Sequence, residues 1–156
     1  MHDSIHVMER KIYTPIQKDQ VIFLKTAADT NGEYSLVEVE LADGGGVGLH
    51  YYKTYAEKFD CLEGEVRIQL GKKIYSLQPG QSATALPTIN HLFRNRSGNP
   101  CKFLVELRPA SRGFEQSLQI GYGLANDGLQ NQLVSQKINW LLPGCLTSVK
   151  VTFPDG

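Results

Sequence analysis

The segment His50-Tyr51-Tyr52-Lys53-Thr54-Tyr55-Ala56-Glu57 carries the most information about the fold of this chain. Gly44 precedes it by six residues, and Gly64 follows its glutamate by seven. Alternate side chains of a β-strand point to the same face, so we expect His50 and Tyr52 to share one face. The segment therefore indicates a strand that presents a histidine and a tyrosine together.

Glu57 has the wrong parity for the face that carries His50. A bend or bulge at Tyr55-Ala56 would reset the register, because one inserted residue moves every later side chain to the other face. We therefore expect Glu57, Phe59 and Cys61 to face inward on the strand that follows.

A second cluster, Gly80…His91…Asn95, lies further along the chain. His91 and Phe93 should share a face on a separate strand. Inward positions on adjacent strands lie about 5 Å apart, so a small barrel could bring His50, Glu57 and His91 together. Two imidazoles and one carboxylate with open coordination positions form a ligand set for non-haem iron, and the same set suits Mn, Ni or Zn. Alternatively, Glu57 could have a structural role and form a salt bridge with an arginine such as Arg67 or Arg94.

Short runs rich in β-branched and aromatic residues recur between about residues 10 and 108, separated by turn signals such as Asn31-Gly32 and Pro79-Gly80. We predict strands within 12–14, 21–24, 34–41, 66–70, 74–77 and 102–107. Many short strands at regular spacing favour a closed barrel or a sandwich.

The pattern changes at Pro109, where apolar residues begin to recur at helical spacing. Ser111 is a plausible N-cap for a first helix, which includes Phe114 and Leu118. A second helix is predicted from Leu133 to Trp140-Leu141. We expect one domain over residues 1–156, with a core of about 10–108, a helical extension of about 109–142 and a tail of 143–156.

Composition limits the classes of function. The 156 residues include 16 basic and 16 acidic side chains, so the formal net charge is zero. This balance argues against a nucleic-acid partner and against attraction to a membrane surface. The chain has no apolar run of the roughly 18–20 residues that a spanning helix needs. Its N-terminus does not begin a signal peptide, and its three cysteines form no CxxC pair. We expect a cytoplasmic protein with reduced thiols.

The first segment resembles the first motif of the cupin superfamily, G-x5-H-x-H-x4-E-x6-G. Gly44, His50, Glu57 and Gly64 fit that spacing, while Tyr52 stands where the family has its second histidine.

The second cluster resembles the second cupin motif, G-x5-P-x-G-x2-H-x3-N. Gly80, His91 and Asn95 keep the spacing. The proline is displaced by one position, to Pro87, and the inner glycine is replaced by Thr88 or Ile89. The resemblance covers about residues 35–108.

The resemblance implies an all-β fold, a single cupin jelly-roll β-barrel, to which we add two C-terminal helices. It implies a divalent metal ion (Fe, Mn, Ni or Zn) bound by His50, Glu57 and His91. Tyr52, Phe59 and Phe93 would line a pocket at one mouth. Arg108 would bind a substrate carboxylate there if its strand face points inward, and would be solvated if that face points outward.

The leading function is a small-molecule-binding cupin, of the metal-dependent oxygenase type with a 2-His-1-Glu site. Two alternatives stay open. One is a non-catalytic ligand-binding or sensory cupin. The other is a metal-independent sugar isomerase or epimerase with His50 or His91 as base and Tyr52 as acid. Whether the protein is an enzyme is open at this stage. We also expect a homodimer, because many cupins pair and because the appended helices and the N-terminal arm offer surfaces for pairing.

Overall fold

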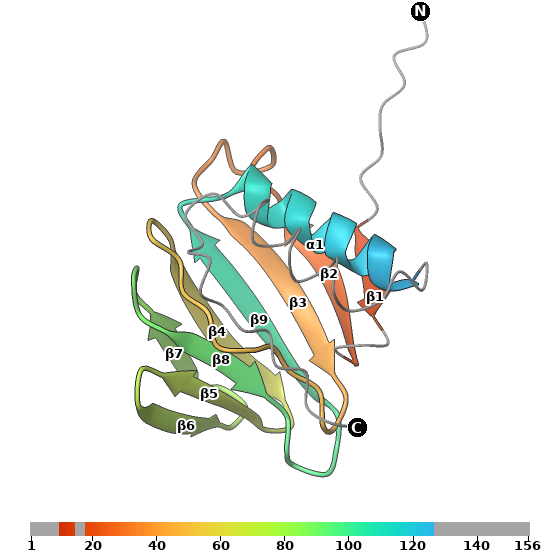
Figure 1. The fold of residues 1–156 in the computed structure, drawn as a ribbon, viewed down its shortest axis with the longest axis vertical. Coiled ribbons are helices and arrows are strands. Elements are labelled where there is room, and N and C mark those ends of the chain that lie inside the picture. Colours follow the sequence, from red (N-terminus) through yellow and green to blue (C-terminus); the bar gives the residue numbers. More distant parts are fainter. Residues whose placement is uncertain (1–9, 15–17, 127–156) are drawn as a thin grey trace, which may run out of the picture.

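The computed structural model describes residues 10–14 and 18–126. Within these ranges the chain forms nine strands and one helix (Figure 1). The elements are β1 (Lys11–Thr14), β2 (Asp19–Lys25), β3 (Ser35–Leu41), β4 (Ala56–Glu63), β5 (Val66–Leu70), β6 (Lys73–Leu77), β7 (Ser82–Ala85), β8 (His91–Arg94), β9 (Cys101–Arg108) and α1 (Arg112–Asn126). Strands are present at all six of the ranges predicted between residues 12 and 107, so the β-rich class is confirmed. The strand expected at residues 50–52 is not formed, and His50 makes an isolated bridge there.

The strands form two antiparallel sheets. One has six strands in the order β1-β2-β3-β9-β4-β7, and the other has three in the order β6-β5-β8. Buried and less buried residues alternate along β3, β4 and β9, as expected for strands with one face toward a core. The core contains buried side chains of both sheets, among them Phe59 and Phe103 of the larger sheet and Ile68 and Phe93 of the smaller one.

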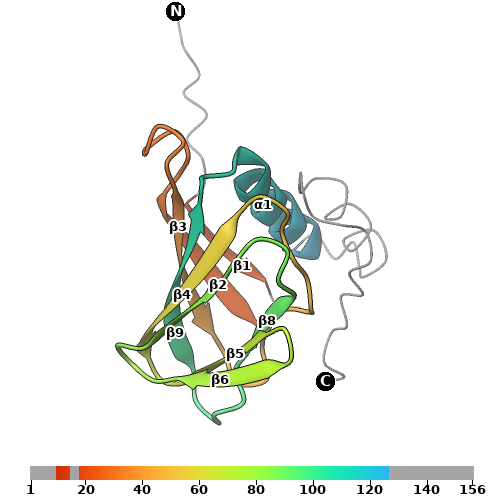
Figure 2. The same ribbon diagram turned by 90° about the vertical axis from the view of Figure 1, so that its left-hand side faces the viewer.

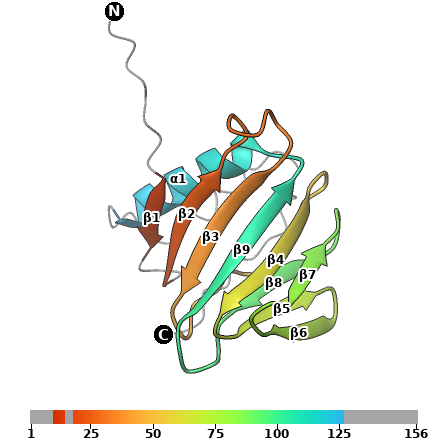
Figure 3. The same cartoon turned by 180° about the vertical axis from the view of Figure 1, so that it is seen from behind.

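The small sheet and α1 cover the same face of the large sheet. Figures 1 and 3 show α1 across β1, β2 and β3, whereas β5, β6 and β8 lie over the β4 and β7 side. The view in Figure 2 separates these layers. Leu118 of α1 packs against the same core cluster as the strands. The helix and the small sheet thus together cover one apolar face of the large sheet.

The closed barrel that the sequence suggested is not formed, because the sheets stay separate. The segment between β3 and β4 makes only two isolated bridges to β8, Gly46 with Arg94 and His50 with His91. Glycine is a poor strand former, and three glycines in succession begin this segment. Gly46 is needed there, since a Cβ would lie 2.5 Å from the Phe93 carbonyl oxygen.

Helix α1 matches the first helix predicted from the sequence. Ser111 is its N-cap, because the Ser111 Oγ accepts the Phe114 N–H at 3.1 Å. The described part of the chain holds this one helix, so the expectation of two C-terminal helices is not borne out there. The predicted second helix, from Leu133 to Leu141, lies outside the described residues.

Within residues 10–14 and 18–126, no helix is long and apolar enough to cross a bilayer. Cys61 and Cys101 are free thiols in the buried core. Burial raises the pKa of both thiols, that of Cys101 to about 12, so neither side chain is a reactive thiolate at neutral pH.

Candidate metal centre

His50, Glu57 and His91 meet between the two sheets, with one ligand atom of each lying within 4.8 Å of the other two. Glu57 comes from β4 of the large sheet, and His91 comes from β8 of the small sheet. His50 lies in the irregular segment that bridges to β8. Two neighbouring segments and one distant segment therefore supply the site.

Glu57 reaches the interior because the register is reset just before β4. The strand begins at Ala56, and Glu57, Phe59 and Cys61 are buried in alternation with more exposed neighbours. The inward orientation predicted for these three residues is confirmed.

His50 and His91 are held side by side by their own backbones. The His50 N–H donates to the His91 carbonyl at 3.0 Å, and the His91 N–H donates to the His50 carbonyl at 2.8 Å. The centroids of the two imidazole rings are 4.3 Å apart. This reciprocal bridge fixes the spacing of the histidines independently of their side chains.

Backbone carbonyls also orient both imidazoles. Nδ1 of His50 lies 2.8 Å from the Gly48 carbonyl, and Nδ1 of His91 lies 2.8 Å from that of Ile89. With Nδ1–H donating in each ring, Nε2 is left to face Glu57. The distances from Glu57 Oε2 are 2.5 Å to His91 Nε2 and 3.8 Å to His50 Nε2. Metal-binding histidines are commonly fixed by such a hydrogen bond from the other ring nitrogen.

The electrostatics of the site couple Glu57 and His91. Burial alone raises the pKa of the Glu57 carboxyl, but the charge of His91 and hydrogen bonds from both histidines lower it to about 2. Burial lowers the pKa of His91, but the Glu57 carboxylate outweighs this and raises it above its ordinary value. In the metal-free pair each partner thus favours the charged form of the other, and a cation could replace the proton on His91 Nε2.

Tyr52 lies beside the two imidazoles, at ring-centroid distances of 5.3 Å to His50 and 5.7 Å to His91. Its side chain is buried, with 5% of the residue exposed. On its other side it meets the rings of Tyr55 and Phe114. The residue at the second histidine position of the motif is therefore part of the wall of the site.

Of the two predicted pocket phenylalanines, Phe59 lies next to the triad and Phe93 lies in the core. The Phe59 ring lies 6.1 Å from the His91 ring, next to the site. Phe93 stacks against Phe59 and Phe103, at 6.1 and 5.1 Å, and belongs to the core.

Arg108 is not a pocket residue, and the outward alternative holds. It follows the buried Leu107 on β9 and therefore points to the opposite face. Its side chain is 47% exposed and donates to Glu33 at 3.0 Å and to Glu106 at 3.2 Å. The guanidinium also lies 4.9 Å from the ring centroid of Tyr34.

Glu57 does not pair with Arg67 or Arg94, since its ion pairs are with the two histidines. Arg67 alternates with the buried Val66 and Ile68, so it points away from the core.

Asn95, the last residue of the second motif, has a structural role. It is fully buried, and its Nδ2 donates to the carbonyls of Leu41 at 2.9 Å and Asn99 at 2.7 Å. Its Oδ1 accepts the Ser97 N–H at 3.0 Å. One side-chain amide thereby joins the end of β3 to the β8–β9 connection.

Thr88 occupies the inner glycine position of the second motif. It has φ 73°, a left-handed conformation that β-branched residues rarely adopt. Its N–H donates to the Tyr52 carbonyl at 2.6 Å, and the next residue, Ile89, supplies the carbonyl that orients His91. The strained turn thus links both motifs at the site.

The cluster of Leu107 and Phe114 against Tyr52 was not foreseen from the sequence. Leu107 is the register partner of Glu57 across β9 and β4. Helical spacing placed Phe114 on the apolar face of the predicted helix, but no local signal shows where that helix will pack.

Comparison with known proteins agrees with this geometry. The family model described as a cupin domain matches residues 37–106, a range that contains all three candidate ligands. This match supports membership of the cupin superfamily, and the solved structures below share the fold. A search of curated protein sequences gave no significant match.

Several solved structures share the fold. The ectoine synthase from P. lautus is 24% identical, with a TM-score of 0.58 over 70% of this chain and 76% of that one. The protein TT1209 from Thermus thermophilus is 27% identical, with a TM-score of 0.56 over 62% and 88%. A predicted oxalate decarboxylase from Thermotoga maritima is 18% identical, with a TM-score of 0.56 over 58% and 80%.

Proposed function

We propose that the protein is a metal-dependent, small-molecule-binding cupin in which His50, Glu57 and His91 hold one divalent cation. The observation that carries this proposal is the convergence of His50 Nε2, His91 Nε2 and Glu57 Oε2 on one point, with both Nδ1 atoms tied to backbone carbonyls. A buried carboxylate between two oriented imidazoles fits a divalent ion by donor type, number and charge.

The donor set suits Fe, Mn, Ni or Zn. Three protein ligands leave coordination positions open for a small molecule. A bound ion of this kind would supply the Lewis-acid or redox activation that an oxygenase-type activity requires. The chain's own contribution is to orient the imidazoles, to keep Glu57 ionised, and to place the Tyr52 phenol ring beside both histidines.

A metal-free role is the second candidate, supported by the 2.5 Å contact between His91 Nε2 and Glu57 Oε2. A histidine and a glutamate that form an ion pair with each other need no metal ion, and they could line a non-catalytic ligand-binding or sensory pocket. For a sugar isomerase or epimerase, the Glu57 carboxylate raises the pKa of His91 and so favours its protonated form. The orientation of both imidazoles by backbone carbonyls supports the metal-dependent candidate.

Metal content tests the proposal. The wild type, loaded with Fe(II), Mn(II), Ni(II) or Zn(II) and desalted, should retain about one equivalent by mass spectrometry. Glu57→Gln and His91→Ala should retain little of it. Glu115→Gln is the matched control, because Glu115 is as buried as Glu57 but lies outside the triad. Well under half an equivalent in the wild type with all four metals would contradict the proposal.

We further propose a cytoplasmic homodimer with no nucleic-acid partner. The zero net charge supports the last point. The short strand β1 is an edge of the six-stranded sheet, which a second copy could extend. Sedimentation equilibrium should give twice the chain mass of 17.4 kDa, and a monomer at tens of micromolar protein would contradict the dimer.

A further inference from the structure

Helix α1 packs against the Tyr52 side of the candidate metal centre. Phe114 is in its first turn, and the Phe114 ring stands edge-on to Tyr52 at 6.3 Å and 89°. Phe114, Tyr52 and Leu107 form one buried cluster, with exposures of 7%, 5% and 0%. Since Leu107 pairs with Glu57 in the sheet, this cluster adjoins the triad directly.

Little of the triad reaches solvent. The side chains of His91 and Glu57 are 2% and 5% exposed, and that of His50 is 14% exposed. The triad is therefore largely enclosed, and Tyr52, backed by Phe114, forms one wall around it.

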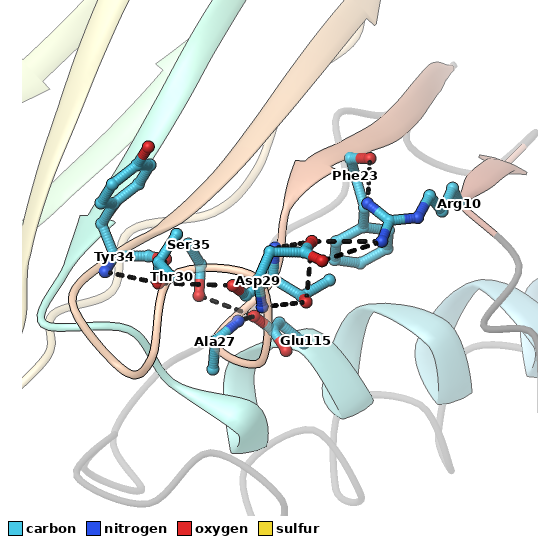
Figure 4. A network of polar contacts seen from close by, with 9 residues as sticks. Arg10, Phe23, Ala27, Asp29, Thr30, Tyr34, Ser35 and Glu115 are labelled. Carbon is cyan, nitrogen blue, oxygen red and sulfur yellow. Dashed lines mark hydrogen bonds and ion pairs between the residues drawn. The ribbon is translucent and has the colours of Figure 1, made fainter.

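Two polar attachments hold the first turn of α1 in place. The Ser111 Oγ donates to the Tyr55 hydroxyl at 3.1 Å, and the Tyr55 ring contacts Tyr52 at 5.7 Å. Glu115 Oε1 accepts the Ala27 N–H at 2.6 Å and the Ser35 hydroxyl at 2.8 Å (Figure 4).

The second attachment lies on the row of sheet residues that contains Glu57. In the register, Glu57 pairs with Leu107, and Leu107 pairs with Ser35. The helix is thus bonded to the same row that supplies the metal ligand, on the far side of Leu107. Breaking this attachment would leave a buried carboxylate and two donors without partners, which disfavours an outward swing of the helix.

We propose that Phe114 is a specificity-determining residue that restricts the centre to ligands of a few non-hydrogen atoms and excludes ring-bearing ligands. This inference rests on the proposed metal site. Replacing Phe114 by a small residue would open a ring-sized space beside Tyr52, because the interior relaxes only partly around a deleted side chain.

Two hydroxamates that share one metal-binding group test the inference. Acetohydroxamate carries a methyl group and benzohydroxamate carries a phenyl group. The full chain is loaded with Co(II), and each hydroxamate is titrated while the visible absorption of the cobalt is followed. We expect the wild type to bind acetohydroxamate at least tenfold more tightly than benzohydroxamate. Phe114→Ala should reduce this preference to threefold or less.

Two further variants make the comparison specific. Phe114→Leu should give an intermediate preference and covers the case in which Phe114→Ala does not fold. Ile120→Ala removes an exposed side chain of α1 that belongs to neither buried cluster, and it should keep the wild-type preference. Equal binding of both hydroxamates by the wild type would overturn the inference, and so would an unchanged preference in the Phe114 variants. A wild type that takes up no Co(II) would instead reject the metal site itself.

Discussion

At the scale of single residues, Tyr52 is the main departure from the family pattern. It occupies the position of the second motif histidine, and its ring lies beside both imidazoles. A neutral phenol is a poor metal ligand, because it must first lose a proton whose ordinary pKa is about 10. Hydrogen bonding to a ligand of the metal is the easier role for this side chain.

We predict that Tyr52→Phe retains the metal and shifts the melting temperature by a few degrees at most, because one hydroxyl contributes about 1 kcal/mol. Tyr52→His should tighten metal binding by supplying a fourth ligand. A metal titration of the wild type and both variants checks this. Weaker binding by Tyr52→His than by the wild type would mean that position 52 is not a ligand position.

Thr88 carries backbone strain at the same end of the molecule. The strain of a β-branched residue at φ 73° costs roughly 1–2 kcal/mol of folding free energy, and glycine would relieve it. Glycine also raises the conformational entropy of the unfolded chain, which offsets about 0.5–1 kcal/mol of this stabilisation. We therefore predict that Thr88→Gly stabilises the protein by up to about 1 kcal/mol in urea unfolding. Thr84→Gly, on strand β7, is the control and should destabilise it. A loss of stability in Thr88→Gly would show that the threonine side chain makes a compensating contact.

The pair of Glu57 and His91 predicts a pH dependence for the metal-free protein. The raised pKa of His91 stabilises the fold fully below its unfolded value of 6.5, and this contribution is lost as the pH rises through the folded value. The lowered pKa of Glu57 stabilises the fold above 4.5, and this contribution is lost as the pH falls toward 2. The pair should thus contribute most between about pH 4.5 and 6.5.

Chelator-treated wild type and His91→Gln, melted across this range, test the expectation. The difference in their melting temperatures should be largest near pH 5–6 and should shrink above neutral pH. A difference that grows from pH 6 to pH 9 would contradict the assignment of a charged His91.

At the scale of elements, α1 is fixed by a buried polar network rather than by apolar packing alone. Figure 4 shows Glu115 between Ala27 and Ser35, next to the network in which Asp29 pairs with Arg10. The carboxylate of Glu115 joins the helix to the β2–β3 connection and to the first residue of β3.

We predict that Glu115→Ala costs about 1–3 kcal/mol of unfolding free energy, because it leaves two buried donors without their acceptor. Glu33→Ala breaks an exposed ion pair and should cost under about 1 kcal/mol. Urea unfolding of both variants gives the comparison. Equal losses would show that the Glu115 network does not hold the helix.

At the scale of the whole molecule, strand alternation and motif spacing predicted the β-rich fold and the inward faces of Glu57 and His91, because both depend on local geometry. The face of Arg108 stayed open, since Leu104, Glu106 and Arg108 share one strand face and give no clear apolar pattern. Closure of the barrel was expected wrongly, because it depends on the glycine-rich segment, which forms bridges instead of a strand. The packing of α1 against Tyr52 could not be predicted, because it depends on contacts between residues that are distant in sequence.

The most direct test of the metal centre is X-ray absorption spectroscopy of the zinc-loaded protein. We expect a first shell of nitrogen and oxygen at about 2.0–2.2 Å, with the multiple scattering of two imidazoles. A sulfur shell near 2.3 Å, or a wild-type spectrum without imidazole scattering, would contradict the three-ligand centre.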